Sequence, residues 1–225
     1  MGRGLALELA RAGASVAITF RSDFEEAQET LREIAALGGE AMAVRCDVRD
    51  PLNVSEAVEE VAAEMGGLDL LINNAGAFET VPLEQISTEQ WDAMFETNTR
   101  GPFLVAKAAY PYLKEARGRI VNIGSLGGLH PWTTHAHYCT SKAALHMLSQ
   151  TMAKAWAPEI SVNCVAPGMI VHGDTAESGY QHFAEKTPMR RNGRVDDVAA
   201  AVMFFATGPH FITGQLIAVD GGLAL

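Results

Sequence analysis

Short apolar segments alternate with longer segments of helical periodicity along most of this sequence. Within residues 23–37, for example, apolar side chains recur at intervals of three and four, which predicts a helix. Residues 68–72 form a mainly apolar run, which is typical of a strand covered on both faces. Strands and helices that alternate in this way build a doubly wound parallel sheet with helices on both faces. We therefore predict an α/β fold of that class.

The predicted strands are residues 15–20, 41–44, 68–72, 119–123, 160–166 and 215–219. The predicted helices are residues 23–37, 88–95, 101–114, 137–155 and 195–206, with another that opens at Asp50-Pro51. The sequence has no internal repeat, linker or low-complexity segment, so we expect a single domain over residues 1–225. Residues 171–188 are polar and weakly periodic and leave the end of a strand, and we expect them to form a lid over the substrate.

Composition excludes several classes of function. A formal net charge of −10 argues against a nucleic-acid partner, because the phosphate backbone favours a basic surface. No apolar run reaches the roughly 18 residues that a membrane-spanning helix needs. The three cysteines have no framework spacing, and the N-terminus is unlike a secretory signal. We therefore expect reduced thiols in a cytoplasmic protein.

Tyr138, Lys142 and Ser125 are the main candidates for chemistry. Tyr138 and Lys142 lie four residues apart in a predicted helix, so their side chains share one face. A nearby ammonium favours the phenolate, which would lower the phenol pKa from about 10 and make Tyr138 a general acid and base. Ser125 follows a predicted strand and would lie at its carboxyl end, where open α/β sheets bind ligands. A tyrosine and a lysine at this spacing also occur by chance in many helices, so the surrounding motifs matter.

These motifs form an ordered series along the sequence. They are Cys46-Asp47-Val48, Asn73-Asn74-Ala75-Gly76, Asn98, Gly124-Ser125, Tyr138-Cys139-Thr140-Ser141-Lys142, Val162-Asn163 with Pro167-Gly168, and Val219-Asp220-Gly221-Gly222. In this order and spacing, the chain resembles the short-chain dehydrogenase/reductase family over essentially its whole length. Within that family it is similar to bacterial 3-oxoacyl-acyl-carrier-protein reductases. The resemblance implies a Rossmann-type sheet and the interconversion of a small-molecule carbonyl and an alcohol by hydride transfer from a nicotinamide cofactor.

The resemblance also implies residue roles. Tyr138 would exchange a proton with the substrate oxygen, and Ser125 would hold that oxygen and stabilise developing charge. Lys142 would lower the pKa of Tyr138 and hydrogen-bond the nicotinamide ribose. Asn98 would position a water that links Lys142 to solvent, or else it is an amide that caps a helix kink.

The same resemblance implies the cofactor contacts. Small residues after a strand allow the backbone to approach the cofactor closely, and the expected contacts are Asn74, Ala75, Gly76, Asp47, Val48, Gly2, Pro167, Gly168, Ile170, Tyr138 and Lys142. Asp47 would face the adenine, although a turn or helix-cap aspartate is the alternative. Pro167, Gly168 and Ile170 would flank the nicotinamide.

The end of the second strand indicates which dinucleotide is bound. NAD-specific relatives place an acid there to bind the ribose 2′-hydroxyl, whereas this sequence has Phe20. Arg21 and Ser22 follow, and a guanidinium beside a hydroxyl suits a 2′-phosphate. We therefore predict NADP(H) rather than NAD(H), with Arg21 as a solvated loop cation as the alternative.

The front of the sequence departs from the family pattern. The family begins with a strand and a Gly-rich turn, and Met1-Gly2-Arg3-Gly4 matches only the tail of that turn. Relative to the family we therefore expect an N-terminal truncation that lacks the first strand, which normally lies at the centre of the sheet. Its absence would leave strand edges unpaired and a void in the core. Either a longer protein is the working form, or the shorter form binds cofactor poorly.

Other departures are local. His172 stands where relatives usually carry threonine. His130, His135 and His137 precede Tyr138, but they lack a carboxylate or cysteine partner at a known spacing, so we predict no metal site. Cys139 is expected to be a small buried residue rather than a nucleophile.

Two other functions remain open. The first is a catalytically silent relative that binds a ligand or a partner through the same fold. The second, more distant, is a methyltransferase of similar architecture, which would have no use for Tyr138 and Lys142. The resemblance further implies a homo-oligomer, a tetramer or a dimer, with residues 101–114, 137–155 and 215–225 at the interfaces.

Overall fold

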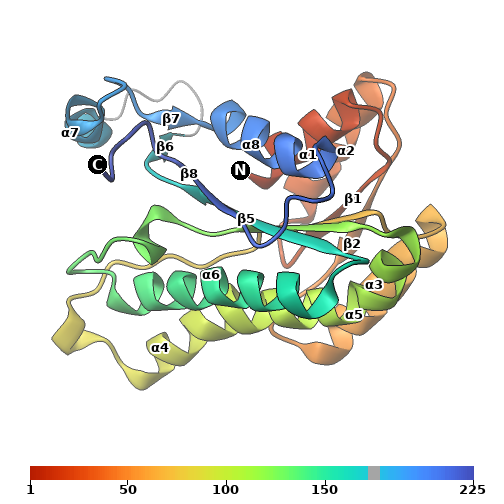
Figure 1. Ribbon diagram of the computed structural model, residues 1–225, viewed down its shortest axis with the longest axis horizontal. Coiled ribbons are helices and arrows are strands. Elements are labelled where there is room, and N and C mark those ends of the chain that lie inside the picture. The colour runs from red at the N-terminus through yellow and green to blue at the C-terminus, as the bar shows by residue number, and fades with distance from the viewer. Residues whose placement is uncertain (172–177) are drawn as a thin grey trace.

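The computed structural model describes residues 1–171 and 178–225, and Figure 1 shows them as parallel strands between two layers of helices. The strands are β1 (Val16–Phe20), β2 (Ala41–Arg45), β3 (Leu70–Asn73), β4 (Arg119–Ile123), β5 (Ser161–Pro167), β6 (Ile170–Val171), β7 (Gly193–Arg194) and β8 (Leu216–Val219). They form three parallel groups, β1-β2, β3-β4-β5-β8 and the short pair β6-β7. The predicted parallel α/β architecture is confirmed.

Six of the eight helices agree closely with those predicted from the sequence, and α1 and α7 are additional. The helices are α1 (Gly2–Arg11), α2 (Phe24–Ala36), α3 (Pro51–Met65), α4 (Thr88–Phe95), α5 (Gly101–Ala116), α6 (Ala136–Trp156), α7 (Ser178–Lys186) and α8 (Val195–Thr207). Short helical turns lie at η1 (Leu83–Gln85), η2 (Glu96–Arg100) and η3 (Leu126–Gly128), and η2 is a π turn between α4 and α5. Among the helices of residues 1–171 and 178–225, none is long and apolar enough to cross a membrane.

Local sequence signals explain where the helices begin. Asp50 caps α3, because its carboxylate accepts the N–H groups of Leu52 and Asn53, and Pro51 occupies the first turn as predicted. Asp23 caps α2 in the same way by accepting the N–H of Glu26. These caps fix the points at which the chain leaves the strands and returns along the sheet.

Alternating side chains of the strands fill two separate cores. Ile120 of β4 packs with α5 and α6, whereas its neighbours Val121 and Ile123 pack with α1 and α8 on the opposite face. In Figure 1, α1, α2 and α8 accordingly lie above the sheet, and α3, α5 and α6 lie below it. A strand buried on both faces explains why the apolar residues of β4 include the adjacent pair Ile120 and Val121 rather than strictly alternating positions.

The sheet is divided between β1 and β3. In the described part of the chain, β1 pairs with β2 and β3 pairs with β4, but β1 and β3 do not pair with each other. Between them lies a cavity of about 700 Å³, to which β1 contributes Val16 and Ile18 and β3 contributes Leu70 and Ile72. The predicted void and unpaired strand edges at this position are confirmed.

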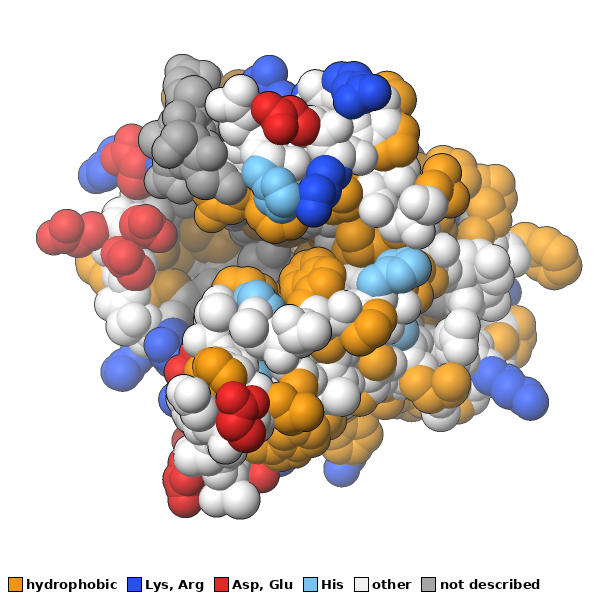
Figure 2. Space-filling view, turned by 90° about the vertical axis from the view of Figure 1, so that its left-hand side faces the viewer, with side chains coloured by type: hydrophobic (Ala, Val, Ile, Leu, Met, Phe, Trp, Pro, Cys, Tyr) orange, Lys and Arg blue, Asp and Glu red, His pale blue; other side chains and the backbone are white. Residues whose placement is uncertain are grey.

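The strands β4 and β5 run toward the left side of Figure 1, where α7 and the chain's C-terminus also lie. Figure 2 shows that end of the molecule, where apolar and histidine side chains gather around a hollow. Helix α7 falls within the segment that was predicted to be a lid. The rest of that segment, residues 172–177 with His172, lies outside the described residues.

Candidate active site

Ser125 lies where the sequence predicts, directly after β4 and Gly124 at the carboxyl end of the sheet. It is buried, and its Oγ accepts the N–H of Gly127 at 3.0 Å. This bond fixes the start of the turn η3 and holds the serine hydroxyl beside the first turn of α6. The Ser125 side chain lies close enough to the Tyr138 phenol to lower its pKa. The structure therefore brings the serine and the tyrosine together, although they are thirteen positions apart in the sequence.

The pKa of Tyr138 is raised, and burial is the main cause. The nearby Ser125 side chain acts in the opposite direction but is outweighed. The net direction is opposite to the expected lowering of this pKa by Lys142. The phenol is therefore protonated at neutral pH, which is the form that donates a proton.

The Lys142 side chain reaches from α6 to the carboxyl end of β4. Its Nζ donates to the backbone carbonyl of Ile123 at 2.9 Å, which is the one hydrogen-bond partner it has among the described residues. The side chain is almost completely buried, and burial lowers the pKa of Lys142 to about 8. A Cβ added to Gly76 would lie 3.4 Å from this Nζ, so the ammonium sits next to bare backbone. Two of its three N–H donors remain available there.

Asn98 lies in the π turn η2 and is fully buried. Its Oδ1 accepts the N–H of Ala77 at 2.7 Å, and its Nδ2 donates to the carbonyl of Ala77 at 2.9 Å and to Ser141 Oγ at 3.0 Å. The amide thus ties the turn after β3 to helix α6. A Cβ on Gly76 would lie 3.3 Å from Asn98 Oδ1, so Asn98 and Lys142 approach the same glycine. π turns inside helices are frequent at functional sites.

His146 is a site residue that the sequence analysis missed. It lies one helical turn after Lys142, and its Nε2 accepts the backbone N–H of Ser125 at 3.3 Å. The ring packs so closely against Gly124 and Gly128 that neither position has room for a Cβ. Burial and the Lys142 charge lower the pKa of His146 to about 4, so the ring is neutral and can accept this bond. The spacing of four that links Tyr138 to Lys142 also links Lys142 to His146 and would have indicated it.

The predicted cofactor residues lie along the carboxyl edge of the strands. Asn74, Ala75 and Gly76 follow β3, with Ala75 and Gly76 exposed, and Gly2 opens α1 beside Asn74. A Cβ on Gly2 would lie 2.8 Å from Asn74 Nδ2, so these two segments approach closely and a larger residue at Gly2 would displace the Asn74 amide. Pro167 ends β5, followed by Gly168, and Ile170 begins β6.

Asp47 is paired within its own loop. Its carboxylate accepts hydrogen bonds from the Arg49 guanidinium at 2.6 Å and 2.9 Å and from the Arg49 N–H at 3.0 Å. These bonds lower the pKa of Asp47 to about 2. The structure therefore shows the turn aspartate that the sequence analysis left as the alternative. Val48 packs against Gly101, where a Cβ would lie 2.9 Å from the valine side chain.

Arg21 follows β1 and lines a hollow of about 390 Å³ together with Arg45 of β2. Arg45 Nε donates to the carbonyl of Arg21 at 3.2 Å, so the two chain segments are joined at this point. The sequence analysis did not identify Arg45, because the register that pairs Phe20 with Arg45 is a property of the sheet. Three carboxylates, Asp47, Asp50 and Glu56, line the same hollow. Ser22 lies in the bend just after Arg21.

Two histidines near the site have different surroundings. His135 shares hydrogen bonds with Thr80 at 3.0 Å and Thr134 at 2.9 Å. His137 is completely buried and lies 3.5 Å from a Glu79 oxygen. The thiol of Cys139 is buried, and that burial raises the pKa of Cys139, which favours the unreactive thiol.

A serine–tyrosine–lysine set at the carboxyl edge of a parallel sheet, with the serine and lysine buried and the tyrosine half-buried, defines an enzyme of the Rossmann-type α/β class that moves a proton at a carbonyl or alcohol oxygen. The comparisons with known proteins agree. The family model described as enoyl-(acyl carrier protein) reductase matches residues 1–224, and the chain belongs to the short-chain dehydrogenase/reductase family.

Two curated relatives show this similarity at the sequence level. A 3-oxoacyl-[acyl-carrier-protein] reductase of Synechocystis sp. is 34% identical over 229 residues, which cover 100% of this chain and 93% of the relative. The short chain dehydrogenase/reductase AacuN of Aspergillus aculeatus is 35% identical over 243 residues, covering 100% of this chain and 91% of that protein.

Solved structures show the same likeness. A short-chain dehydrogenase/reductase from Burkholderia xenovorans has a TM-score of 0.94 at 30% identity and covers 99% of this chain and 93% of its own. A gluconate 5-dehydrogenase from Burkholderia cenocepacia, in complex with NADP and tartrate, has a TM-score of 0.90 at 32% identity, with 98% and 89% covered. The chain is thus an oxidoreductase of this family that acts on small molecules.

Proposed function

We propose that the chain interconverts a carbonyl and an alcohol by hydride transfer, with NADP(H) as the cofactor and Tyr138 as the acid and base. The observation that carries the proposal is that Ser125 lies close enough to the Tyr138 phenol to lower its pKa, while the Lys142 ammonium lies at the end of β4 beside the open backbone at Gly76. A serine hydroxyl and a phenol so close together can both reach one substrate oxygen. The buried ammonium binds the Ile123 carbonyl, two residues before Ser125.

Each residue has a distinct task in this proposal. Ser125 holds the substrate oxygen, and its own geometry is fixed by Gly127 and His146. Tyr138 gives its proton to that oxygen during reduction and takes it back during oxidation. Its raised pKa favours the protonated phenol, which suits the direction of reduction. The Lys142 charge stabilises the phenolate that forms when the proton leaves.

The residues at the carboxyl edge fit a nicotinamide dinucleotide. The backbone at Gly76 supports this fit. It is exposed and lies next to the free donors of Lys142, so a ribose hydroxyl would find both space and hydrogen-bond partners there. The residues that would hold the dinucleotide are Gly2, Asn74, Ala75, Gly76, Val48, Pro167, Gly168 and Ile170. When bound, it supplies the two electrons and the hydrogen that the carbonyl carbon receives as hydride, and Tyr138 supplies the proton to oxygen.

The preference for NADP(H) rests on two cations. Arg21 and Arg45 stand at the ends of adjacent strands and line one hollow, and guanidinium groups suit a phosphate. The gluconate 5-dehydrogenase is described in complex with NADP, whereas another similar structure, with a TM-score of 0.90 at 29% identity, is described as an NADH-dependent reductase. The positions of Arg21 and Arg45 are therefore what favours NADP(H) in this chain.

The experiment that tests the proposal uses the whole chain. NADPH oxidation is followed with a panel of ketones, quinones, sugars and acyl thioesters, and Tyr138→Phe is the matched variant. We expect turnover that falls at least about a hundredfold in Tyr138→Phe. Equal turnover in the two proteins would contradict the role of Tyr138.

A catalytically silent relative is the second candidate. The specific observation in its favour is the divided sheet, since the cavity between β1 and β3 reaches Gly2 and Asn74 of the cofactor edge. Titration of NADPH fluorescence separates the two candidates. A silent protein with a disturbed cofactor edge would leave the fluorescence unchanged, whereas the enzyme would change its intensity and position.

We further propose a homo-oligomer, a dimer or a tetramer, in the cytoplasm. Exposed apolar side chains on two long helices support an oligomer, since Phe103 of α5 is 41% exposed and Met147 of α6 is 63% exposed. The C-terminal segment adds Ile217 and Leu225. Three free cysteines are compatible with a reducing compartment. Light scattering coupled to size-exclusion chromatography tests the assembly, and a monomer at micromolar concentration would exclude it.

A further inference from the structure

Four aromatic rings, the Tyr138 ring among them, form a closed cluster. Phe78 meets the Tyr138 ring edge-on at 4.9 Å between centroids, and Trp132 lies nearly parallel to it at 6.2 Å. His135 closes the cluster by stacking on Phe78 at 4.9 Å and meeting Trp132 edge-on at 5.6 Å. The residue that is proposed to meet the substrate oxygen is therefore carried on a wall of planar groups.

Trp132 is fixed to the serine loop. A Cβ at Gly127 would lie 3.2 Å from the Trp132 ring and 3.2 Å from the Cys139 sulfur, so the indole packs directly over the backbone whose N–H binds Ser125. His135 is held in turn by Thr80 and Thr134. The wall is thus rigid on the side where the substrate oxygen would be held.

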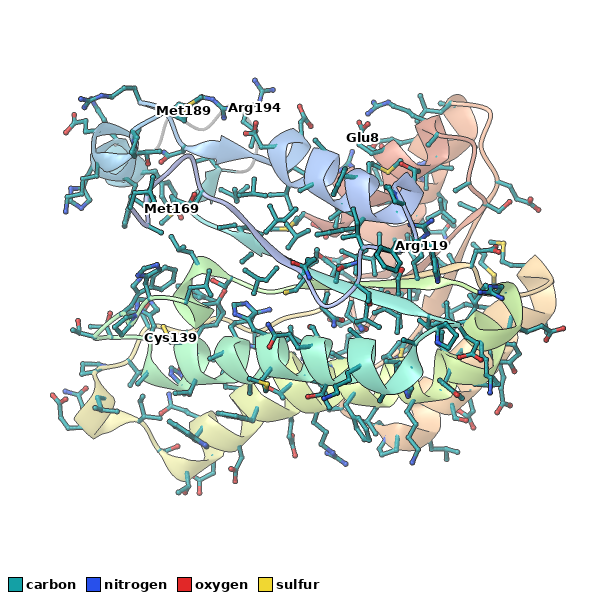
Figure 3. The ribbon with its side chains drawn as sticks, in the orientation of Figure 1. Glu8, Arg119, Cys139, Met169, Met189 and Arg194 are labelled. Carbon is teal, nitrogen blue, oxygen red and sulfur yellow. The ribbon has the colours of Figure 1, made fainter. Side chains whose placement is uncertain are left out.

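Phe78 provides the open part of this wall. It follows the turn that Asn98 fixes through Ala77, and it is 60% exposed although it lies against Tyr138. An exposed large apolar ring beside a catalytic group is a surface that a ligand can cover. Met189, 65% exposed, adds an apolar group to the same end of the molecule, and Figure 3 shows Met169 and Met189 above Cys139 of α6.

We propose that the substrate carbonyl is attached to a planar aromatic ring, which packs against Phe78 and Trp132 while its oxygen meets Ser125 and Tyr138. This inference rests on the proposed function and names its substrate class. Rings that meet edge-on or stacked are favoured beyond the area they bury. A flat ring can make both contacts at once, whereas a saturated ring or a flexible acyl chain can make neither with the same geometry.

The test measures binding rather than turnover. Trp91→Phe with Trp156→Phe leaves Trp132 as the single tryptophan of the three, and its emission reports on ligands at the wall. The probes are 1-phenylethanol and 1-cyclohexylethanol, which have the same carbon skeleton and differ in the flat aromatic ring. We expect 1-phenylethanol to bind about five times more tightly, or 1.0 kcal/mol at that ratio.

The matched variants are Phe78→Leu, which keeps apolar bulk but removes the ring, and Phe211→Leu, which changes a phenylalanine that is 99% exposed. We expect Phe78→Leu to abolish the preference for the aromatic probe and Phe211→Leu to retain it. Equal affinity of the two probes for the parent protein would overturn the inference, as would a preference that survives in Phe78→Leu.

These outcomes are separable from the proposed function. Turnover of aliphatic acyl thioesters without any aromatic preference in binding would refute the substrate class and leave the oxidoreductase in place. A preference for the aromatic probe in binding, without NADPH oxidation by any carbonyl, would refute the oxidoreductase and leave the aromatic ligand class in place. Binding of 1-phenylethanol to Tyr138→Phe provides the check that the ring contacts act independently of the proton transfer.

Discussion

The imidazole of His146 accepts the backbone N–H of Ser125 through Nε2, at 3.3 Å, one helical turn beyond the lysine of the site. The bond requires a neutral ring with its proton on Nδ1. Burial and the Lys142 charge keep the ring in that form. His146 therefore supports the loop that positions the serine hydroxyl, without itself reaching the substrate.

Replacing His146 should reduce catalysis through Ser125. In His146→Leu the Ser125 N–H loses its acceptor inside the protein, and we expect kcat to fall about tenfold with KM for NADPH nearly unchanged. His146→Gln can present an amide oxygen to the same N–H and should recover part of the loss. Steady-state kinetics of the two variants check this, with the exposed Met147→Leu as control. Equal rates for the leucine and glutamine variants would show that only ring volume matters.

The His146 pKa predicts how stability depends on pH. The pKa falls from 6.5 in the unfolded chain to about 4 in the folded protein. As pH falls, the unfolded state therefore binds the proton before the folded state does. The stability associated with neutral His146 is fully present above pH 6.5 and is lost as pH falls toward 4. We expect the unfolding free energy to fall by roughly 3 kcal/mol more in the parent than in His146→Leu over this window. Urea unfolding of both proteins at several pH values measures this difference. The same pH dependence of the unfolding free energy in the two proteins would contradict the prediction.

Lys142 should lower the stability of the folded protein at neutral pH, although turnover requires it. Burial lowers its pKa to about 8, so below that pH the folded protein holds a costly buried charge. Because the unfolded chain keeps the proton up to 10.5, stability from this group should rise with pH between 8 and 10.5. We expect Lys142→Met to abolish turnover yet raise the unfolding free energy at pH 7 by about 2 kcal/mol. A calorimetric melt at pH 7 decides it, and a large destabilisation would contradict the prediction.

The two arginines should determine the dinucleotide. Arg21→Ala and Arg45→Ala each remove one charge-assisted partner for a 2′-phosphate, and we expect KM for NADPH to rise about tenfold while KM for NADH changes little. Arg32→Ala is the matched control, because Arg32 is exposed on α2 and pairs with Glu29. An equal effect on both cofactors would indicate a general electrostatic role.

Most of the secondary structure could be predicted, because it depends on local signals. The predicted boundaries of 88–95 and 119–123 coincide with α4 and β4. The predicted strand at 68–72 is displaced to Leu70–Asn73, because Gly66 and Gly67 adopt positive φ and the ladder with β4 starts at Leu70 opposite Arg119. The π turn at Glu96–Arg100 was not predicted, since its insertion interrupts the helical period.

The parts of the site whose geometry follows from sequence spacing could be predicted. The parts whose geometry depends on the tertiary fold could not. A spacing of four correctly placed Tyr138 and Lys142 on one helix, α6. The direction of the Tyr138 pKa could not be predicted, because it depends on how deeply the phenol is buried. Arg45 joins the site only through the register of β1 with β2. Asp47 is occupied by Arg49, two residues away, a local pairing that a family motif does not reveal.

The division of the sheet has a mechanical consequence. Arg45 lies in the two-stranded piece, and Arg21 directly follows it. Ser125 follows β4 of the four-stranded piece, and Lys142 hydrogen-bonds to the β4 carbonyl of Ile123. No strand pairing joins β1 to β3 in the described chain, so the two pieces cohere mainly through the helices that flank them. A dinucleotide that contacts both pieces would link them. Cofactor binding and thermal stability therefore depend on the same contacts between the two pieces.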